Sequence, residues 1–596
     1  MILDDAHFNK KNLSCSWIDD KKAFDSVSHE WITKALEIHG VNADLIHLIK
    51  TIMKAWNINL EVTTNKAVSV TSNLKKIFTD IGLEWGINKC AAIHLKRGKL
   101  SISNNSTALP VSNNCTSPVL SNDDHYKFLG KYQNSQHLED KVIEEAAKEY
   151  ENRLRAVWTS PLSVPRKVRA TNIYALPILQ YYMWSTDWCI NNLKELDRLT
   201  RHVINECSGK HKYESTRLLY LPSEEGGKGL IEIESVYKNT KLKVAHYINN
   251  SEDPHIKLVK SFQNEKEKRN LRSVFKDGKR YAEELELNCY FEDGATVLEG
   301  TDNVTIVNEK EPRKIKQIIH KASMKKRKND VMKQPWIGKF VTQHWQDPQV
   351  SAHSYDIFRQ WKNIPDIVMS VDTSIRQQLL NTKIYRSQKL HEQVDDLSCR
   401  LCFKDQETVS HVLCGCSHIA QSLYKARHDR MLCPVYHALL ERYKFEESEY
   451  SNPWYKQSYP QPSQENNEAK ILWDIPWKLE KCPMNGANRP DISVLDKKNK
   501  EWIIIEGTKC NPGKITMRTK QKKDKYIDLK LGIKNLYPGH KVKLITVVFD
   551  FLAVYYKDLE EELTSILDNN LAKTTIERSQ KWIISQNCEI VKRFLS

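Results

Sequence analysis

Long hydrophobic runs are missing from this 596-residue sequence. The longest apolar stretch, Leu544 to Tyr556, is interrupted by Asp550 and is shorter than the roughly 20 apolar residues that a membrane-spanning helix needs. The first residues, Met1 to Asp5, lack the basic start and the apolar segment of a secretory signal peptide. The sequence therefore predicts an intracellular protein that is neither secreted nor associated with a membrane.

Acidic residues are too few to balance the basic ones. The chain has 91 Lys and Arg against 75 Asp and Glu, which gives a formal net charge of +16. This excess favours a polyanionic partner, and nucleic acid is the first candidate; a generally basic soluble protein is the alternative. Most of the cysteines are scattered singly, which is typical of a reducing compartment and argues against a disulfide framework.

One group of cysteines is not scattered. Cys399, Cys402, His411 and Cys416 follow the pattern C-x2-C-x8-H-x4-C. Three thiolates and one imidazole suit tetrahedral Zn²⁺, and a site filled entirely by protein ligands is structural rather than catalytic. Cys414 and His418 are possible replacements for the fourth ligand, and separate buried thiols are the alternative interpretation. Residues 427–429, Arg-His-Asp, follow on an expected helix, where a buried polar cap is favoured slightly over a nucleic-acid surface.

A C-terminal β-hairpin is expected to bring two carboxylates together. Asp491 opens the first predicted strand, 492–495, and Glu506 ends the second, 502–506. If the strands pair symmetrically about the turn, these two residues are cross-strand partners with Cβ atoms about 4.5 to 5.5 Å apart. They would repel each other unless a cation lay between them, and their oxygens suit Mg²⁺ or Mn²⁺. Taken alone, the pattern also fits a surface hairpin with a solvated turn.

A cationic run follows this hairpin and can hold phosphates or stabilise charge on a scissile phosphate. Lys509 lies three residues after Glu506, so in a regular strand it would face away from the carboxylates. Lys522, on a helix expected after Pro512, is the better candidate for a catalytic lysine.

A second basic run lies between residues 313 and 328. A solvated helix face, a nuclear import signal and a nucleic-acid contact are all consistent with it. The candidate nucleic-acid-binding residues of the two runs are Arg313, Lys314, Lys325, Lys326, Arg327, Lys328, Lys523 and Lys525.

Periodicity gives a coarse map of the remaining elements. A strand is expected at 14–18 and a strand pair at 83–96 with its turn at Gly86. Residues 136–250 are expected to be mostly helical, with breaks at prolines 161, 165 and 177. Residues 251–335 are highly charged and partly linker-like, and 453–467 is expected to be a polar linker.

In this order, several segments carry a resemblance to a known family. They are WIDDKKAFDSVSHEWI, GLEWGINKCAAIHLKRGKL, YKFLG, LKELDRLTR, RLLYLP with GGKGL, ETVSHVLCGCSHIAQSLYKARHD, ILWDIPW, RPDISVLDKKNKEWIIIE and KQKKDKY. The chain resembles the polyprotein of non-LTR retrotransposons of the R-two type, which carry a reverse transcriptase, a zinc knuckle and a restriction-like endonuclease. The resemblance covers nearly the whole chain and implies DNA and RNA as partners and a nuclear location.

The resemblance implies a multidomain α+β protein. It places Asp19 in a polymerase metal position, Asp491, Glu506 and Lys522 in nuclease positions, and Cys399, Cys402, His411 and Cys416 on zinc. The implied domains are a partial polymerase palm at 1–65 with the first metal motif and at 72–135 with the primer-grip segment, a thumb-like helical domain at 136–250, a basic and mostly helical connecting region at 251–395, a zinc knuckle at 396–430, and a C-terminal α/β restriction-like nuclease of the PD-(D/E)xK type, with C-terminal helices, at 465–596.

The chain departs from the family in both catalytic regions. The stretch between Asp25 and Leu83 is much shorter than in the family, and no Asp-Asp pair of the sequence fits the second polymerase motif. Because one Asp cannot hold two metal ions, we predict no polymerase activity. In the nuclease the family often has Asp at position 506, followed by an apolar stretch that ends in Pro, where this chain has Gly507-Thr508-Lys509-Cys510.

The sequence is therefore interpreted as an N-terminally truncated and internally deleted copy of such a protein. The activity expected to survive is metal-dependent cleavage of DNA. The alternative is a catalytically inactive nucleic-acid-binding remnant or a pseudogene product.

Overall fold

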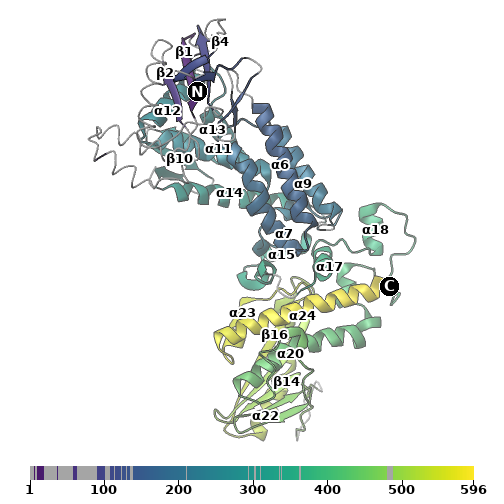
Figure 1. Cartoon of the computed structure of the whole chain (residues 1–596). Coiled ribbons are helices and arrows are strands. Elements are labelled where there is room, and N and C mark those ends of the chain that lie inside the picture. Colours follow the sequence, from purple (N-terminus) through teal and green to yellow (C-terminus); the bar gives the residue numbers. More distant parts are fainter. Residues whose placement is uncertain are drawn as a thin grey trace. The chain divides into compact units, whose positions relative to one another are not determined.

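A computed structural model describes the chain in two compact units (Figure 1). Unit 1 comprises residues 1–152, 177–193 and 237–315, and unit 2 comprises residues 153–176, 194–236 and 316–596. The predicted polymerase ligand Asp19 lies outside the described residues. The structure describes residues 6, 10–18, 37, 58–62, 90–100, 108–112, 115–121, 124–128, 131–133 and 139–595, without 208, 210, 293, 301–303, 309–310, 335, 337, 361–363 and 480–486.

The first sheet of unit 1 is antiparallel, in the order β2-β1-β3-β4. Its strands are β1 (Leu13–Ile18), β2 (Ile58–Val62), β3 (Ala91–Lys96) and β4 (Lys99–Leu100). The strand predicted at 14–18 is confirmed as β1. A tight turn at Arg97 and Gly98, both with positive φ, joins β3 to β4, while the turn predicted at Gly86 lies outside the described residues. Two hairpins follow: β5 (Ala108–Ser112) with β6 (Cys115–Pro118), and β7 (Tyr126–Phe128) with β8 (Lys131–Gln133).

Helices dominate residues 139–250, as the periodicity predicts. They are α6 (Glu139–Thr159), α7 (Val164–Ala170), α8 (Leu176–Met183), α9 (Ile190–Glu206), α10 (Thr216–Leu219) and α11 (Ile233–Asn250). Pro161 follows the end of α6, and Pro165 lies in the first turn of α7, where no backbone donor is lost. Pro161 and Pro165 therefore mark predicted breaks. The break predicted at Pro177 is wrong, because a π-helical turn at Thr171–Ala175 joins α7 directly to α8 and the helix continues past Pro177.

The prediction of a partly linker-like segment at 251–335 is wrong. This segment folds into α12 (Pro254–Lys268), α13 (Val274–Glu283), β9 (Asn288–Glu292), β10 (Ala295–Glu299), β11 (Val304–Asn308) and α14 (Pro312–Met332). The three strands form an antiparallel sheet in which Cys289, Leu298 and Val307 are buried. Alternating apolar residues form the sheet, and the high charge between them hid that alternation.

Between α14 and the C-terminal sheet, unit 2 contains helices joined by turns and loops. Its helices are α15 (Lys339–Gln346), α16 (Ile357–Gln360), α17 (Asp366–Arg376), α18 (Lys383–Leu390), α19 (Val409–Cys414) and α20 (Lys425–Arg442). None of the helices within the described part of the chain is long and apolar enough to cross a membrane.

The C-terminal sheet has the order β12-β13-β14-β15-β16, antiparallel except for the parallel pair β15 and β16. Its strands are β12 (Ser463–Glu465), β13 (Ala469–Trp473), β14 (Ile492–Asp496), β15 (Glu501–Cys510) and β16 (Lys541–Asp550). The helices around it are α21 (Ile515–Lys525), α22 (Ile527–Leu536), α23 (Lys557–Thr564) and α24 (Asn569–Leu595). The linker predicted at 453–467 is partly wrong, because it contains β12, whose polar residues suit an edge strand.

Successive residues of β15 face opposite sides of this sheet. Trp502 and Ile504 pack in a core with Tyr526 and with Leu529 of α22. Ile503 and Ile505 belong to the larger core that contains the buried residues of α20 and α24. Helices therefore cover both faces of β15, and each face can bring a different set of side chains to the end of the strand (Figure 1).

Candidate metal centre and carboxylate site

The structure gathers Cys399, Cys402, His411 and Cys416 into one cluster in unit 2, with their ligand atoms all within 4.8 Å of one another. The Sγ atoms of Cys399 and Cys416 are 3.9 Å apart, close to the S–S edge of about 3.8 Å in a tetrahedron with Zn–S bonds of about 2.3 Å. Cys402 Sγ lies 3.2 Å from His411 Nε2. The cluster can therefore hold a metal ion such as zinc.

Cys416 supplies the fourth ligand atom of this cluster, which the sequence left open. His418 is exposed, and Cys414 is half-buried at the end of α19 and packs against the larger core. Burial raises the pKa of the Cys414 thiol, in spite of the nearby Arg427. The spacing alone could not separate these residues, because all three follow His411 within two helical turns.

The thiols of the cluster differ: backbone groups favour the thiolate of Cys402, whereas burial raises the pKa of Cys416 to about 12. Burial tends to raise the pKa of Cys402, but backbone N–H groups of Lys404 and Asp405 outweigh it and lower that pKa to about 6. The Asp405 carboxylate lies 3.6 Å from Nδ1 of His411, so the ring nitrogen remote from the cluster faces a negative charge. Such outer contacts orient a metal-binding imidazole.

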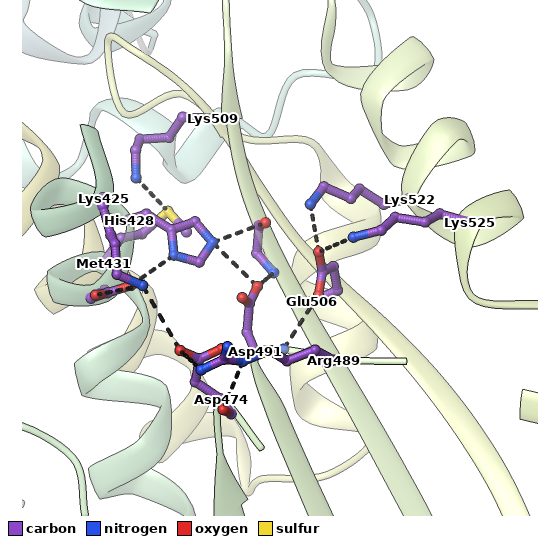
Figure 2. Close-up of polar contacts among 12 residues, drawn as sticks. Lys425, His428, Met431, Asp474, Arg489, Asp491, Glu506, Lys509, Lys522 and Lys525 are labelled. Carbon is purple, nitrogen blue, oxygen red and sulfur yellow. Dashed lines mark hydrogen bonds and ion pairs between the residues drawn. The ribbon is translucent and has the colours of Figure 1, made fainter. Parts of the chain in front are cut away.

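The hairpin of β14 and β15 brings Asp491 opposite Glu506. The ladder pairs Ile492 with Ile505, and one step further the Asp491 N–H donates to Glu506 Oε2 at 3.3 Å. In return, the Gly507 N–H donates to Asp491 Oδ2 at 2.7 Å. The predicted symmetric pairing is therefore present, and it places both carboxylates at one end of the hairpin (Figure 2).

Two lysines of α21 reach the buried Glu506 from the same side. Lys522 Nζ lies 2.5 Å from Glu506 Oε1, and Lys525 Nζ lies 3.7 Å from the same atom. Figure 2 shows both ammonium groups pointing at this carboxylate. The structure thus brings the predicted residues Asp491, Glu506 and Lys522 together.

The environments of the two carboxylates differ. Burial and the charge of Asp491 raise the pKa of Glu506, although Lys522 acts in the opposite direction. Burial would also raise the pKa of Asp491, but the hydrogen bond and charge of His428 together with the Gly507 N–H outweigh it and lower that pKa. The two neighbouring carboxyl groups therefore differ in how readily they ionise.

His428 is part of this site, and no sequence signal placed it there. It lies in the first turn of α20, and its Nε2 is 3.2 Å from Asp491 Oδ2. Its Nδ1 is 3.1 Å from Asp429 Oδ1, and Asp429 accepts a hydrogen bond of 2.6 Å from the Tyr459 hydroxyl. Burial tends to lower the pKa of His428, but these two carboxylates raise it to about 9.

Lys509 occupies the opposite face of β15 from Glu506, as its spacing predicts. Its Nζ lies 3.7 Å from the sulfur of Met431 on α20, and Figure 2 shows it on the side of His428. Burial, helped by the charge of Arg427, lowers the pKa of Lys509 well below its ordinary value. No carboxylate among the described residues is within ion-pair distance of this ammonium group.

Asp474 and Arg489 form the edge of the site next to Asp491. The Asp474 N–H donates to the Asp491 carbonyl oxygen at 2.8 Å, and Arg489 Nε lies 2.8 Å from Asp474 Oδ1. Neither residue was singled out from the sequence, because an exposed ion pair has no spacing signal of its own.

The basic residues predicted to contact nucleic acid have different environments: some form ion pairs within the protein, and others are exposed. Arg327 pairs with Glu232 at 3.0 Å, and Lys328 pairs with Glu225 at 2.6 Å, so both bind α14 to other parts of unit 2. Lys523 pairs with Glu562 at 2.7 Å, and Lys314 pairs with Glu311 at 3.1 Å. Arg313 and Lys325 are exposed on α14, and Lys326 is half-buried there.

A scan against protein-family models and a search of curated proteins each find no match to the chain.

Proposed function

We propose that the C-terminal sheet and its helices form a metal-dependent DNA endonuclease, derived from a retrotransposon protein of the R-two type. The observation that carries this proposal is the convergence of Asp491, Glu506 and Lys522 from β14, β15 and α21. Two buried carboxylates beside a lysine form a small arrangement that can bind a divalent ion next to a phosphate.

The oxygens of Asp491 and Glu506 fit such an ion. Asp491 Oδ2 accepts from the Gly507 N–H and faces His428, while no described residue makes a hydrogen bond or ion pair with Oδ1. Glu506 Oε2 accepts the hydrogen bond of the Asp491 N–H, which is long at 3.3 Å. Asp491 Oδ1 and Glu506 Oε2 would therefore be the protein ligands of Mg²⁺ or Mn²⁺.

The divalent ion would supply a bound water of lowered pKa and would polarise the scissile phosphate. Lys522 holds Glu506 in place and would stabilise the negative charge that develops on the phosphate during attack. Lys525 adds a second positive charge to the same side. The basic surface of the chain would bind the DNA backbone in a salt-dependent way.

The zinc cluster would be structural in this proposal. Four protein ligands surround the metal position, so no coordination position remains for a substrate. We expect no polymerase activity from the chain, because no Asp-Asp pair of its sequence fits the second polymerase motif.

Incubation of supercoiled plasmid with the full-length protein and Mg²⁺ tests the proposal. The wild type should nick the plasmid, and Asp491→Asn should reduce nicking to background because one metal ligand is lost. Asp524→Asn is the matched control, since Asp524 is exposed on α21 and, among the described residues, makes no hydrogen bond or ion pair with Asp491, Glu506 or Lys522. Equal nicking by wild type and Asp491→Asn would reject the proposal.

Absence of nicking by the wild type would also reject it. Zinc-dependent and salt-sensitive binding of DNA or RNA by that same protein would then identify the chain as a nucleic-acid-binding remnant.

A further inference from the structure

The segment that carries the last zinc ligands is fastened to the start of α20. The Tyr424 hydroxyl, one residue before α20, donates to the Val412 carbonyl oxygen at 2.7 Å and accepts from the Cys416 N–H at 3.1 Å. Arg427, in the first turn of α20, donates to the Leu413 carbonyl oxygen at 2.6 Å. These contacts link α19 and Cys416 directly to the first turn of α20.

Arg427 extends the same connection into the core. Its side chain is only 2% exposed and donates to Asn587 of α24 at 2.7 Å. The guanidinium also lies over the Tyr424 ring, 5.0 Å from its centroid. The polar cap that the sequence suggests at this residue is therefore present, and it fixes the beginning of α20 from two sides.

His428 follows Arg427 and reaches in the direction of the carboxylate site. Its Nε2 lies 3.2 Å from Asp491 Oδ2, and Asp429 holds its other ring nitrogen. The close approach of α20 to β15 depends on Gly507, because a Cβ at that position would come within 2.8 Å of Leu432. A continuous set of contacts thus runs from the zinc cluster to one oxygen of Asp491.

We propose that the zinc cluster positions the carboxylate of Asp491 through α20, with His428 as the positioning residue. The inference rests on the proposed function for the role of Asp491, but it makes a separate claim about its orientation. By engaging Oδ2, His428 leaves Oδ1 directed to the divalent ion. Zinc would then act at a distance on the affinity for a different metal ion.

Outer-shell partners of a metal ligand typically change metal affinity by about 10- to 100-fold. We therefore expect His428→Ala to weaken the binding of Mn²⁺ by about 10- to 100-fold. His428→Gln keeps an N–H donor at nearly the same distance from the backbone, so its loss should be less than about tenfold. This contrast separates the hydrogen bond from the general packing of α20.

The first experiment measures Mn²⁺ binding to the full-length protein by electron paramagnetic resonance, with circular dichroism melting of each variant beside it. The expected order of affinity is wild type, His428→Gln and then His428→Ala, with similar melting curves. Unchanged affinity in His428→Ala, or equal losses in the two variants, would overturn the inference.

The second experiment tests whether zinc acts through His428. Cys416→Ser should weaken Mn²⁺ binding in the wild-type background and add little in the His428→Ala background, because both changes remove the same support. Cys189→Ser is the control: Cys189 is exposed and lies in unit 1, so the change should leave Mn²⁺ binding unchanged. Fully additive effects of the two changes would show that the cluster and His428 are independent, which contradicts the inference.

These measurements also separate the inference from the proposed function. If the wild type binds Mn²⁺ and His428→Ala weakens this binding, but the wild type nicks no plasmid, the nuclease proposal fails and the positioning role of His428 stands. If the wild type binds no Mn²⁺, both fail.

Discussion

The zinc cluster and the carboxylate site lie in the same unit but are assembled over very different lengths of chain. The four residues that could hold zinc come from one short segment, Cys399 to Cys416, with α19 as its only helix. The carboxylate site takes side chains from α20, the residue before β14, the middle of β15 and α21. The first site needs only a local turn and a helix, whereas the second exists only after the sheet has formed.

The two sites also balance charge differently. In the zinc cluster, backbone N–H groups face the sulfur of Cys402 and favour its thiolate. In the carboxylate site, side-chain cations from both faces of the sheet, His428 and Lys522, compensate the buried acids. A local cluster can rely on its own backbone, while a site built across a sheet depends on the elements packed against it.

Loss of a zinc ligand should give the largest effect in this comparison. Cys416→Ser should abolish stoichiometric zinc binding and lower the melting temperature sharply, because a structural zinc site contributes directly to folding. Cys414→Ser should keep one zinc ion per chain. Metal analysis and thermal melting check this prediction. Loss of zinc in Cys414→Ser but not in Cys416→Ser would show that Cys416 is not the fourth ligand.

Removal of the Lys522 side chain should give the second-largest effect, which should be a loss of nicking activity rather than of stability. Lys522→Ala should lower the nicking rate by about 100- to 1,000-fold, as for the loss of one donor that stabilises developing charge. Lys525→Ala, the matched change one helical turn away, should lower it by less than about tenfold, because Lys525 is farther from Glu506. Equal losses would mean that only the summed charge of α21 matters.

Gly507→Ala should disturb the carboxylate site from the face of α20. The new methyl group would meet Leu432, and overpacking of this kind costs about 1 to 3 kcal/mol of stability. Denaturant unfolding measures the cost. The double variant Gly507→Ala and Leu432→Ala should lose less stability than the sum of the two single losses, because the smaller side chain at 432 makes room for the methyl group. Strict additivity of the two losses would argue against this contact.

Tyr459→Phe should have the smallest effect, because Tyr459 is the outermost member of the His428 contacts. Burial would raise the pKa of Asp429, but hydrogen bonds from His428 and Tyr459 outweigh it and lower that pKa. A lowered carboxyl pKa stabilises the folded state above the unfolded pKa of about 4 and loses this contribution as the pH falls.

The stability difference between wild type and Tyr459→Phe should therefore be about 1 kcal/mol near neutral pH and should shrink below about pH 4. Urea unfolding at several pH values measures it. A difference that grows on acidification would contradict the assigned hydrogen bond.

Sequence reasoning identified the parts of these sites that depend on local spacing. The zinc ligands and the hairpin register of Asp491 and Glu506 follow from short-range geometry, and Lys522 follows from a helix that begins close after the strand. His428 could not be assigned to the carboxylates, because only the packing of α20 on β15 brings it there.

The same limit explains the errors in the fold. The sequence predicts a partly linker-like segment where β9, β10 and β11 form a sheet, because these short strands lie between highly charged stretches. The edge strand β12 was missed because its residues are polar. In both cases the pairing partners, rather than the residues themselves, decide that a strand forms.

The two-sided character of β15 constrains how this region can change over time. Glu506 and Gly507 are adjacent, yet one meets α21 and the other meets α20. Inserting a single residue upstream in the strand would turn the carboxylate to Leu432 and bring Ile505 beside Lys522, whereas deleting one would put Gly507 beside Lys522. Insertions and deletions in β15 should therefore be tolerated only when they change its length by an even number of residues, because only these keep Glu506 on the side of α21.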